Sequence, residues 1–466
     1  MKKKWSVPMC ILSVLMLLFS GCVSSPQGGA RVSEEAEMPQ SIEEELAALG
    51  YEYPVEDFSD IPAAGEKVFP NAVGFGIYTR AGRGGKIIRV TTLESDGPGS
   101  LRAALEAEGP RIVVFEVGGV IDFEMTTIEI TSPFLTVAGQ TAPSPGITII
   151  RGGLVVKTHD VLIQHIRVRP GDGADLSFRG WEVDGISTYG EDAYNVVIDH
   201  CSVSWATDEG ISVSGPRLPR PRATSHFVTV SNCIIAENLN NATHSKGAHS
   251  KGALIHDNVQ YVAYIGNLFA HNVDRNPYAK AFTLSVVANN LIYNPGTNAI
   301  RVGYVPSEWT GTGVNPLPAR MTAVGNVLIH GENTLPHLAL IGTEGLVFME
   351  DNLAFKKDGS PARLSMGKVT LLHHKPLWPE GFIPVPAEEL EEHIVANVGA
   401  RPADRDSVDE RIIRDLVERK GRIIDSQEEV GGYPAYEPVY RPLEIPDDVE
   451  AWLNELAAEV EGRASR

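Results

Sequence analysis

The sequence predicts an all-β fold, a right-handed single-stranded parallel β-helix with a partly helical C-terminal extension. Two observations carry this prediction. Short runs rich in Val and Ile recur between clusters of Gly, Asn, Asp and Pro from residue 70 onward, which is typical of strands. A His or Asn between two apolar segments also recurs, at positions 165, 200, 232, 267, 290, 326 and 352. Successive positions are 23 to 36 residues apart, and no helix is expected between them. Repeats of this length indicate stacked coils of strands, whereas a β-sandwich would need this spacing to be accidental.

The expected organisation has four parts. Residues 1–21 are a signal peptide, and residues 22–64 are a tether rich in Ser, Glu, Gly and Pro, with one short helix at 42–49. The β-helix is predicted over residues 65–375, and Ser100 is expected to begin a helix within it. The C-terminal extension is predicted over residues 376–466, with helical segments at 387–395, 407–420 and 447–459.

The signal peptide is inferred from the order of residue types at the N-terminus. Three lysines at positions 2–4 precede an apolar run at 5–19, which is too short for a comfortable transmembrane helix. The ending Ser20-Gly21-Cys22 resembles a bacterial lipobox, so we expect lipidation of Cys22 and attachment to a membrane. The alternatives are an ordinary cleaved signal and an uncleaved anchor. Cleavage before Cys22 removes three lysines and no acid, which changes the net charge from −20 to −23.

Composition narrows the function classes. Hydrophobic residues make up 43% of the 466 residues and aromatic residues only 7%, so the core is aliphatic. Sixty acidic residues against 40 basic ones argue against a nucleic-acid partner, because phosphate binding requires a basic face. Beyond the signal and Cys22, Cys201 and Cys233 remain, and they form either one disulfide or, as the simpler reading, two buried free thiols.

Several motifs follow one another along the chain. They are Gly74-Phe75-Gly76, Gly82-Arg83-Gly84-Gly85-Lys86, Gly97-Pro98-Gly99-Ser100-Leu101-Arg102-Ala103-Ala104, Ile198-Asp199-His200-Cys201-Ser202 followed by Asp208, His249-Ser250-Lys251-Gly252-Ala253-Leu254-Ile255 and Arg275-Asn276-Pro277. In this order they resemble secreted pectate lyases of polysaccharide lyase family one. The resemblance is strong over about residues 70–305 and implies calcium-dependent β-elimination of polygalacturonate on a parallel β-helix. The tail at 398–402 and 430–434 is similar to that of a bacterial branch of the family.

Carboxylates form a candidate calcium site. Glu182 and Asp184 lie two residues apart and would share one face of a strand, and Asp208 lies about one coil further on. Converging carboxylates repel one another, and a hard cation with oxygen ligands relieves this repulsion. The resemblance places calcium ligands at these three positions. A fourth family acid falls on Ser212, and Glu209 is a candidate substitute. The alternative is that these are unrelated surface carboxylates.

Arg275 and Lys251 are the candidate catalytic residues. The reaction removes the C5 proton beside a uronate carboxylate, which requires a base and neutralisation of that carboxylate. Arg275 matches the catalytic arginine of the family's Arg-x-Pro motif. The role of base is carried over from the resemblance, since a guanidinium is normally protonated, and the alternative is that Arg275 only binds the substrate carboxylate.

Further basic residues are candidate substrate contacts. The sequence His-Ser-Lys-Gly-Ala occurs twice in succession, so Lys246 is a second candidate beside Lys251, although both would also suit a solvated loop. Lys280 stands where the family has an arginine, which makes a bidentate grip on a carboxylate doubtful. His200 occupies a repeat position and is expected to be structural. The remaining candidates are Arg217, Arg220, Arg222 and Arg301.

The sequence therefore predicts an exported monomeric lyase that uses Ca²⁺ to cleave unesterified polygalacturonate and leaves a 4,5-unsaturated product. A pectin lyase acting on the methyl-esterified polymer would not need the calcium carboxylates. A lyase for another pectic or uronic polymer such as alginate, a non-catalytic carbohydrate-binding β-helix and a surface adhesin are the other readings.

Overall fold

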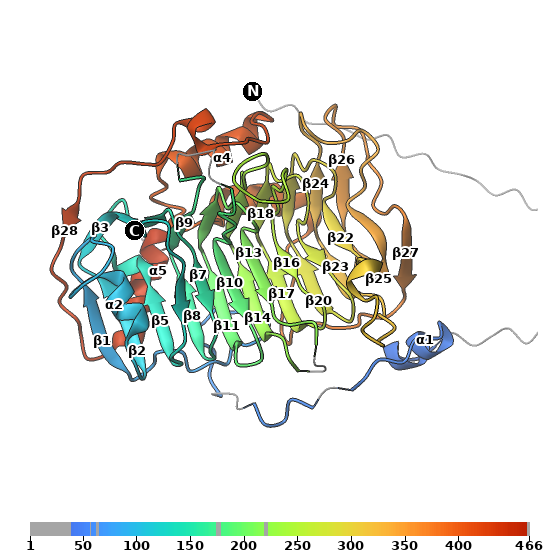
Figure 1. Cartoon of the computed structure of the whole chain (residues 1–466), viewed down its shortest axis with the longest axis horizontal. Coiled ribbons are helices and arrows are strands. Elements are labelled where there is room, and N and C mark those ends of the chain that lie inside the picture. The colour runs from blue at the N-terminus through green and yellow to red at the C-terminus, as the bar shows by residue number, and fades with distance from the viewer. Residues whose placement is uncertain (1–38, 56, 62–64, 174–178, 219–221, 464–466) are drawn as a thin grey trace, which may run out of the picture. The chain divides into compact units, whose positions relative to one another are not determined.

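The computed structural model describes residues 39–55, 57–61, 65–173, 179–218 and 222–463 (Figure 1). Strands follow one another around a solenoid, so that each complete coil adds one strand to each of three parallel sheets. The chain passes from the first sheet to the second, then to the third, and returns to the first in the next coil. The predicted parallel β-helix is confirmed.

The strands of the three sheets have the following bounds. The first sheet contains β1 (Lys86–Val90), β2 (Arg111–Phe115), β5 (Leu135–Ala138), β8 (Val161–Gln164), β11 (Tyr194–Asp199), β14 (His226–Ser231), β17 (Gln260–Ile265), β20 (Leu284–Ala288), β23 (Arg320–Val324) and β27 (Lys368–Leu372). The second contains β3 (Val117–Asp122), β6 (Ile147–Ile150), β9 (Ile166–Arg169), β12 (Ser202–Ser204), β15 (Ile234–Ala236), β18 (Leu268–Ala270), β21 (Leu291–Tyr293), β24 (Val327–Ile329) and β26 (Leu353–Phe355), and β28 (Val439–Tyr440) pairs antiparallel with β3. The third contains β4 (Ile128–Ile130), β7 (Leu154–Val156), β10 (Ile186–Tyr189), β13 (Ile211–Ser214), β16 (Leu254–Ile255), β19 (Tyr278–Ala279), β22 (Ile300–Val302) and β25 (Ile341–Glu350), whose second half continues into the first sheet.

The repeat in the sequence marks the turn between the first and second sheets, but its markers do not all occupy the same position in the coil. His165, His200 and Asn232 are turn residues with left-handed backbone (φ 59°, 46° and 54°). The later markers stand one residue further on; Asn267, for example, follows the left-handed Gly266 (φ 69°). A sequence pattern of one polar residue between apolar runs does not distinguish the turn residue from its inward-pointing successor.

The inward-pointing asparagines form a ladder inside the solenoid. The Asn267 side-chain amide donates to the Asn290 Oδ1 at 2.9 Å, Asn290 donates to Asn326 at 3.1 Å, and Asn326 donates to Asn352 at 3.0 Å. All four side chains are buried, so each amide satisfies its neighbour where water is excluded. In the two preceding coils the same position holds Cys201 and Cys233, which are free buried thiols.

The predicted helices are present. Ser100 begins α2 (Leu101–Glu106), and its hydroxyl accepts a hydrogen bond from the Ala103 amide at 3.2 Å. The tether helix is α1 (Ile42–Ala48), which buries Leu46 against Leu346 and Leu372 of the solenoid. The three helical segments of the extension are α3 (Leu390–Asn397), α4 (Ser407–Glu418) and α5 (Val449–Val460), and short 3₁₀ helices lie at η1 (Gly139–Thr141), η2 (Pro306–Glu308), η3 (Ala387–Glu389) and η4 (Gln427–Val430).

The extension packs on the outside of the solenoid. Apolar side chains of α3 and α4, such as Ile394 and Ile412, join those on the outer face of the second sheet, such as Leu268. Leu453 of α5 packs against Ile112 on the outer face of the first sheet. The extension therefore covers outward faces of two sheets.

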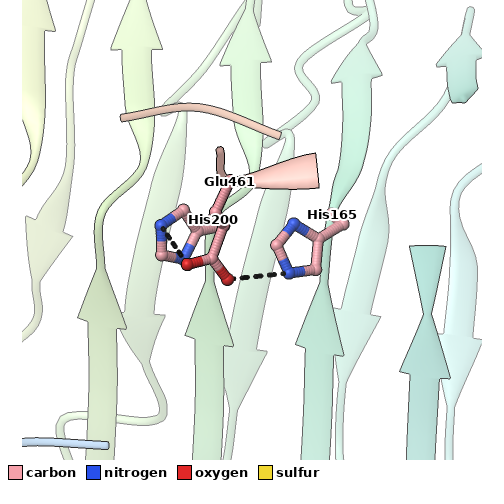
Figure 2. A group of neighbouring side chains, drawn as sticks. All are labelled: His165, His200 and Glu461. Carbon is pink, nitrogen blue, oxygen red and sulfur yellow. Dashed lines mark ion pairs between the residues drawn. The ribbon is translucent and has the colours of Figure 1, made fainter. Parts of the chain in front are cut away.

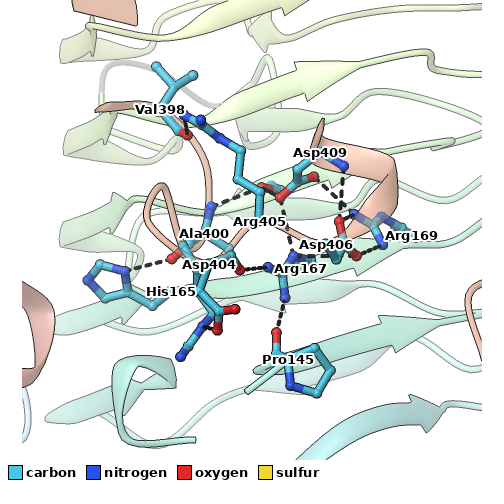
Figure 3. A network of polar contacts seen from close by, with 12 residues as sticks. Pro145, His165, Arg167, Arg169, Val398, Ala400, Asp404, Arg405, Asp406 and Asp409 are labelled. Carbon is cyan, nitrogen blue, oxygen red and sulfur yellow. Dashed lines mark hydrogen bonds and ion pairs between the residues drawn. The ribbon is translucent and has the colours of Figure 1, made fainter. Parts of the chain in front are cut away.

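A buried ion-pair network fastens α4 to the second sheet (Figure 3). Arg169 of β9 contacts Asp406, the N-cap residue of α4, at 2.9 Å and Asp409 at 3.0 Å. Arg167, two residues earlier in the same strand, contacts Asp409 at 3.2 Å. These four side chains have no solvent exposure, so each charge depends on its partners.

The described part of the chain contains no helix with the length and apolarity that crossing a bilayer requires. Cys22 and the predicted signal peptide lie outside the described residues, as does Arg220.

Candidate active site

The candidate site lies where the chain enters the third sheet. Glu209 pairs with Lys251 in the next coil, and Lys251 pairs with Asp274 in the coil after that, each as a parallel bridge. Asp184 belongs to the same row, since the amide of the following Gly185 donates to the Glu209 carbonyl at 3.0 Å. Four consecutive coils therefore each contribute one charged residue at equivalent positions.

Glycines allow these coils to approach each other closely. Gly252 follows Lys251, and a Cβ atom at Gly252 would lie 2.4 Å from the Arg275 carbonyl oxygen. No side chain fits at that distance. In the His-Ser-Lys-Gly-Ala sequence, Lys251 therefore supplies the cation, and Gly252 lets the backbone of Arg275 pack closely beside it.

Three of the predicted metal ligands come together. Carboxylate oxygens of Asp184, Asp208 and Glu209 lie within 4.8 Å of one another. Asp184 also accepts a hydrogen bond from the Glu209 amide at 2.9 Å. Burial and the neighbouring Asp208 carboxylate raise the pKa of Asp184 well above its ordinary value. Such a set of oxygen donors, in which two neighbouring carboxylates repel each other, fits a hard divalent cation such as Ca²⁺.

Glu182 lies outside this group, contrary to the expectation of a shared strand face. The residues before Ile186 do not form a strand, so the alternation that would align Glu182 with Asp184 is absent. Glu182 instead accepts a hydrogen bond from the Ser245 amide at 2.9 Å, and hydrogen bonds from Ser245 lower its pKa. Ser212 lies within β13 and accepts from the Leu254 amide at 3.3 Å, so Glu209 supplies the third carboxylate of the group.

Two histidines that the sequence analysis did not select flank Asp208. His249 Nε2 lies 2.7 Å from Asp208 Oδ1, and the rings of His244 and His249 stack with centroids 3.7 Å apart. Burial raises the pKa of Asp208, but the contact with His249 outweighs it and holds this pKa below its ordinary value. The signal for these residues was the duplicated His-Ser-Lys-Gly-Ala sequence, in which only the lysines were considered.

Arg275 lies directly against the carboxylate group. Its guanidinium forms an ion pair with Glu209, its backbone is left-handed (φ 63°), and burial lowers its pKa. The preceding residue, Asp274, holds two further cations, Arg301 at 2.9 Å and Lys251 at 3.4 Å. Lys251, Arg275 and Arg301 thus lie together beside the acids, with Asp274 as a positioning residue that the sequence did not reveal.

Tyr278 is a further residue of the site that the sequence did not reveal. The Arg301 guanidinium lies 4.3 Å from the centre of the Tyr278 ring, and the Arg275 guanidinium lies 5.8 Å from it. The ring therefore offers both guanidinium groups a cation–π contact.

Three of the other predicted substrate contacts pair with acids outside the carboxylate group. Lys280, two residues after Tyr278 in the chain, and Arg217 both contact Asp257, at 3.2 and 2.8 Å, and both pair with Glu308. Arg222 pairs with Asp60 at 2.8 Å, away from the carboxylate group. Lys246 is exposed on the loop beside His244.

Comparisons with known proteins give relatives along most of the chain. No family model matches. "Probable pectate lyase C" of Emericella nidulans is 32% identical over 402 residues, which are 83% of this chain and 86% of that protein. The protein of the same name from Aspergillus flavus is 31% identical over 402 residues, 83% of this chain and 87% of its own length.

Solved structures of similar chains are more distant. A pectate lyase bound to a hexasaccharide has a TM-score of 0.49 and 14% identity, and the match covers 72% of this chain and 98% of that one. The major allergen from cedar pollen has a TM-score of 0.47 and 18% identity, with 69% of this chain and 91% of that one covered.

Proposed function

This chain belongs to the pectate lyase family and is a polysaccharide lyase, and from that premise we propose that it cleaves polygalacturonate by calcium-dependent β-elimination. The observation that carries the proposal is the grouping of three carboxylates with three cations at the entry to the third sheet. The expected product carries a 4,5-unsaturated sugar at its new non-reducing end.

The proposed calcium ligands are Asp184, Asp208 and Glu209. When bound there, Ca²⁺ would neutralise the uronate carboxylate and so make the adjacent C5 proton more acidic. Glu182 is the fourth acid that the sequence predicted as a calcium ligand. In this structure its carboxylate accepts a hydrogen bond from the Ser245 amide instead.

The chain's own residues bind the substrate and remove the proton. Lys251 and Arg301, held by Asp274, bind a substrate carboxylate through charge-assisted hydrogen bonds. Arg275 acts in its neutral guanidine form. A guanidine nitrogen takes the C5 proton and the group becomes guanidinium, the electron pair of the C5–H bond forms the C4–C5 double bond, and the C4–O bond breaks. The departing oxygen takes a proton from water. Burial lowers the pKa of Arg275, which favours this role, whereas the ion pair with Glu209 opposes it.

Calcium removal is the direct test. With polygalacturonate as substrate, we expect the ultraviolet absorbance of the unsaturated product to increase at mildly alkaline pH. Chelation should slow the reaction by about tenfold or more, because the substrate carboxylate loses its neutralising charge. Added Ca²⁺ should restore the rate, and Mg²⁺, which demands a tighter octahedral site, should not.

The same assay separates the alternatives. Faster cleavage of alginate than of polygalacturonate would indicate a different uronic polymer. Saturable binding of polygalacturonate without any product, with and without Ca²⁺, would indicate a non-catalytic carbohydrate-binding β-helix and would contradict the lyase proposal.

We also propose export and lipid attachment at Cys22, on the basis of the three lysines, the apolar run and the Ser20-Gly21-Cys22 sequence. Both relatives named above are fungal, whereas the lipobox is a bacterial signal, so the host matters for the test. In a bacterial host we expect a labelled fatty acid to enter the protein and a Cys22→Ser variant to remain unlabelled. Equal labelling of both proteins would refute the assignment.

A further inference from the structure

A second group of ionisable side chains lies away from the active site, at the turn between the first and second sheets. His165 and His200 occupy the same position in consecutive coils, and Glu461 reaches them from the end of α5 (Figure 2). The three side chains are 0%, 9% and 4% exposed. The group therefore joins the solenoid to the C-terminal end of α5.

The distances within this group are too long for hydrogen bonds. Glu461 Oε1 lies 3.5 Å from His165 Nε2, and Glu461 Oε2 lies 3.7 Å from His200 Nε2. His165 Nε2 is buried and has no hydrogen-bond partner in the described structure. A buried ring nitrogen without a hydrogen-bond partner destabilises the folded protein, and a ligand bound at Nε2 would remove this cost.

The opposite ring nitrogens are both occupied. His165 Nδ1 lies 2.8 Å from the Ala400 carbonyl oxygen, which can only accept, so Nδ1 carries the proton and the neutral ring has its lone pair at Nε2. His200 Nδ1 lies 2.8 Å from Asp199 Oδ2. Asp199 is itself fixed by hydrogen bonds from Ser231 at 2.7 Å and Gln164 at 2.9 Å. Metal-binding histidines are usually oriented in this way, with the second nitrogen donating to a carbonyl or a carboxylate.

We propose that His165, His200 and Glu461 form a binding site for a zinc-type divalent transition-metal ion that fastens the extension to the solenoid. In a tetrahedral site with bonds of about 2.0–2.1 Å, neighbouring ligand atoms lie roughly 3.3 Å apart. The two observed separations, 3.5 and 3.7 Å, start from different oxygens of the Glu461 carboxylate, so a bound ion would draw the three side chains slightly closer together. Two imidazole nitrogens and one carboxylate suit Zn²⁺, Co²⁺ or Ni²⁺, whereas Ca²⁺ takes oxygen ligands.

Arg463 competes with a metal ion for Glu461, and a second group with two histidines competes for the metal ion. Arg463 also pairs with Glu461, but its side chain is 45% exposed and can turn to solvent when a cation takes its place. The other group with two histidines among the described residues, His244 and His249 beside Asp208, belongs to the active site, where Asp208 is a proposed calcium ligand.

Cobalt binding provides the test, independently of lyase activity. After chelator treatment and dialysis, the purified protein should bind one equivalent of Co²⁺ with a visible ligand-field band, and Zn²⁺ should displace it. Glu461→Gln, which keeps the shape of the side chain, should abolish the band. The matched control His249→Gln should retain it. Thermal unfolding should shift upward by several degrees with Zn²⁺ in the unaltered protein but not in Glu461→Gln.

The opposite results would overturn the proposal. These are the absence of a Co²⁺ band, or a band lost in His249→Gln and kept in Glu461→Gln. If Glu461→Gln does not fold, crystals of the unaltered protein grown with Zn²⁺ decide the question by anomalous scattering at the zinc edge. A peak beside His165 Nε2 and His200 Nε2 supports the site, and a peak only elsewhere, or none, refutes it.

Discussion

Replacement of Arg275 by lysine is expected to lower kcat on polygalacturonate by about 100-fold or more, the range of an acid–base contribution. Lysine keeps the positive charge but is shorter, and it loses the planar group that contacts Glu209 and lies near the Tyr278 ring. The nitrogen that receives the C5 proton would be displaced. Because the backbone at Arg275 is left-handed, circular dichroism and thermal unfolding must accompany the kinetics.

The kinetic pattern distinguishes the two roles that the sequence left open for Arg275. A base acts in the transition state, so its loss lowers kcat with little change in KM, whereas loss of a substrate contact raises KM. A variant with normal kcat and a raised KM would contradict the role of base. Arg422→Lys is the matched control, because Arg422 is a surface residue that pairs with Glu429, and this variant should show unaltered kinetics.

Replacement of Arg169 by methionine should destabilise the protein by about 3–5 kcal/mol, the usual cost of leaving a buried charge without its partner. Methionine fills much of the same volume, but Asp406 and Asp409 lose three contacts with a cation in a place without solvent. The measurement is the shift of the urea unfolding midpoint, followed by circular dichroism.

Arg151→Met is the control for this prediction. Arg151 pairs with Asp122 at the surface, where the two side chains are 34% and 37% exposed, so its loss should cost at most about 1 kcal/mol. Equal destabilisation by both variants would refute the account of the buried network.

The pH dependence gives a second readout. Burial acts to raise the pKa of Asp406, but Arg169 and Arg167 outweigh it and hold this pKa far below its ordinary value. A carboxyl group whose folded pKa is depressed contributes stability above its unfolded pKa of about 3.9, and this contribution is lost as the pH falls below that value. The loss of stability on acidification below about pH 4 should therefore be smaller in Arg169→Met than in the unaltered protein.

The fold was largely readable from the sequence, because each coil repeats the same alternation of apolar residues and turn. The register was not, since Asn267 and His200 look alike in the pattern although one points inward and the other forms the turn. The position of Glu182 was missed for a related reason. Strand alternation applies only within strands, and the chain before Ile186 is irregular.

Site residues that belong to a short sequence motif were predicted. Site residues whose role depends on contacts between stacked coils were missed. Asp208, Lys251 and Arg275 stand in recognisable motifs. Asp274 acts through contacts with residues 23 and 27 positions away, which no local pattern encodes. Similarly, nothing near Lys280 in the sequence reveals that Glu308, from a later coil, pairs with its ammonium group.

The two buried cysteines have a consequence for how the protein can be made. Cys201 and Cys233 continue the inward stack as thiols, and no covalent link joins them. The described part of the chain therefore holds its fold without a disulfide between them. We expect this part of the chain to reach the same native structure in a reducing cytoplasm and outside the cell.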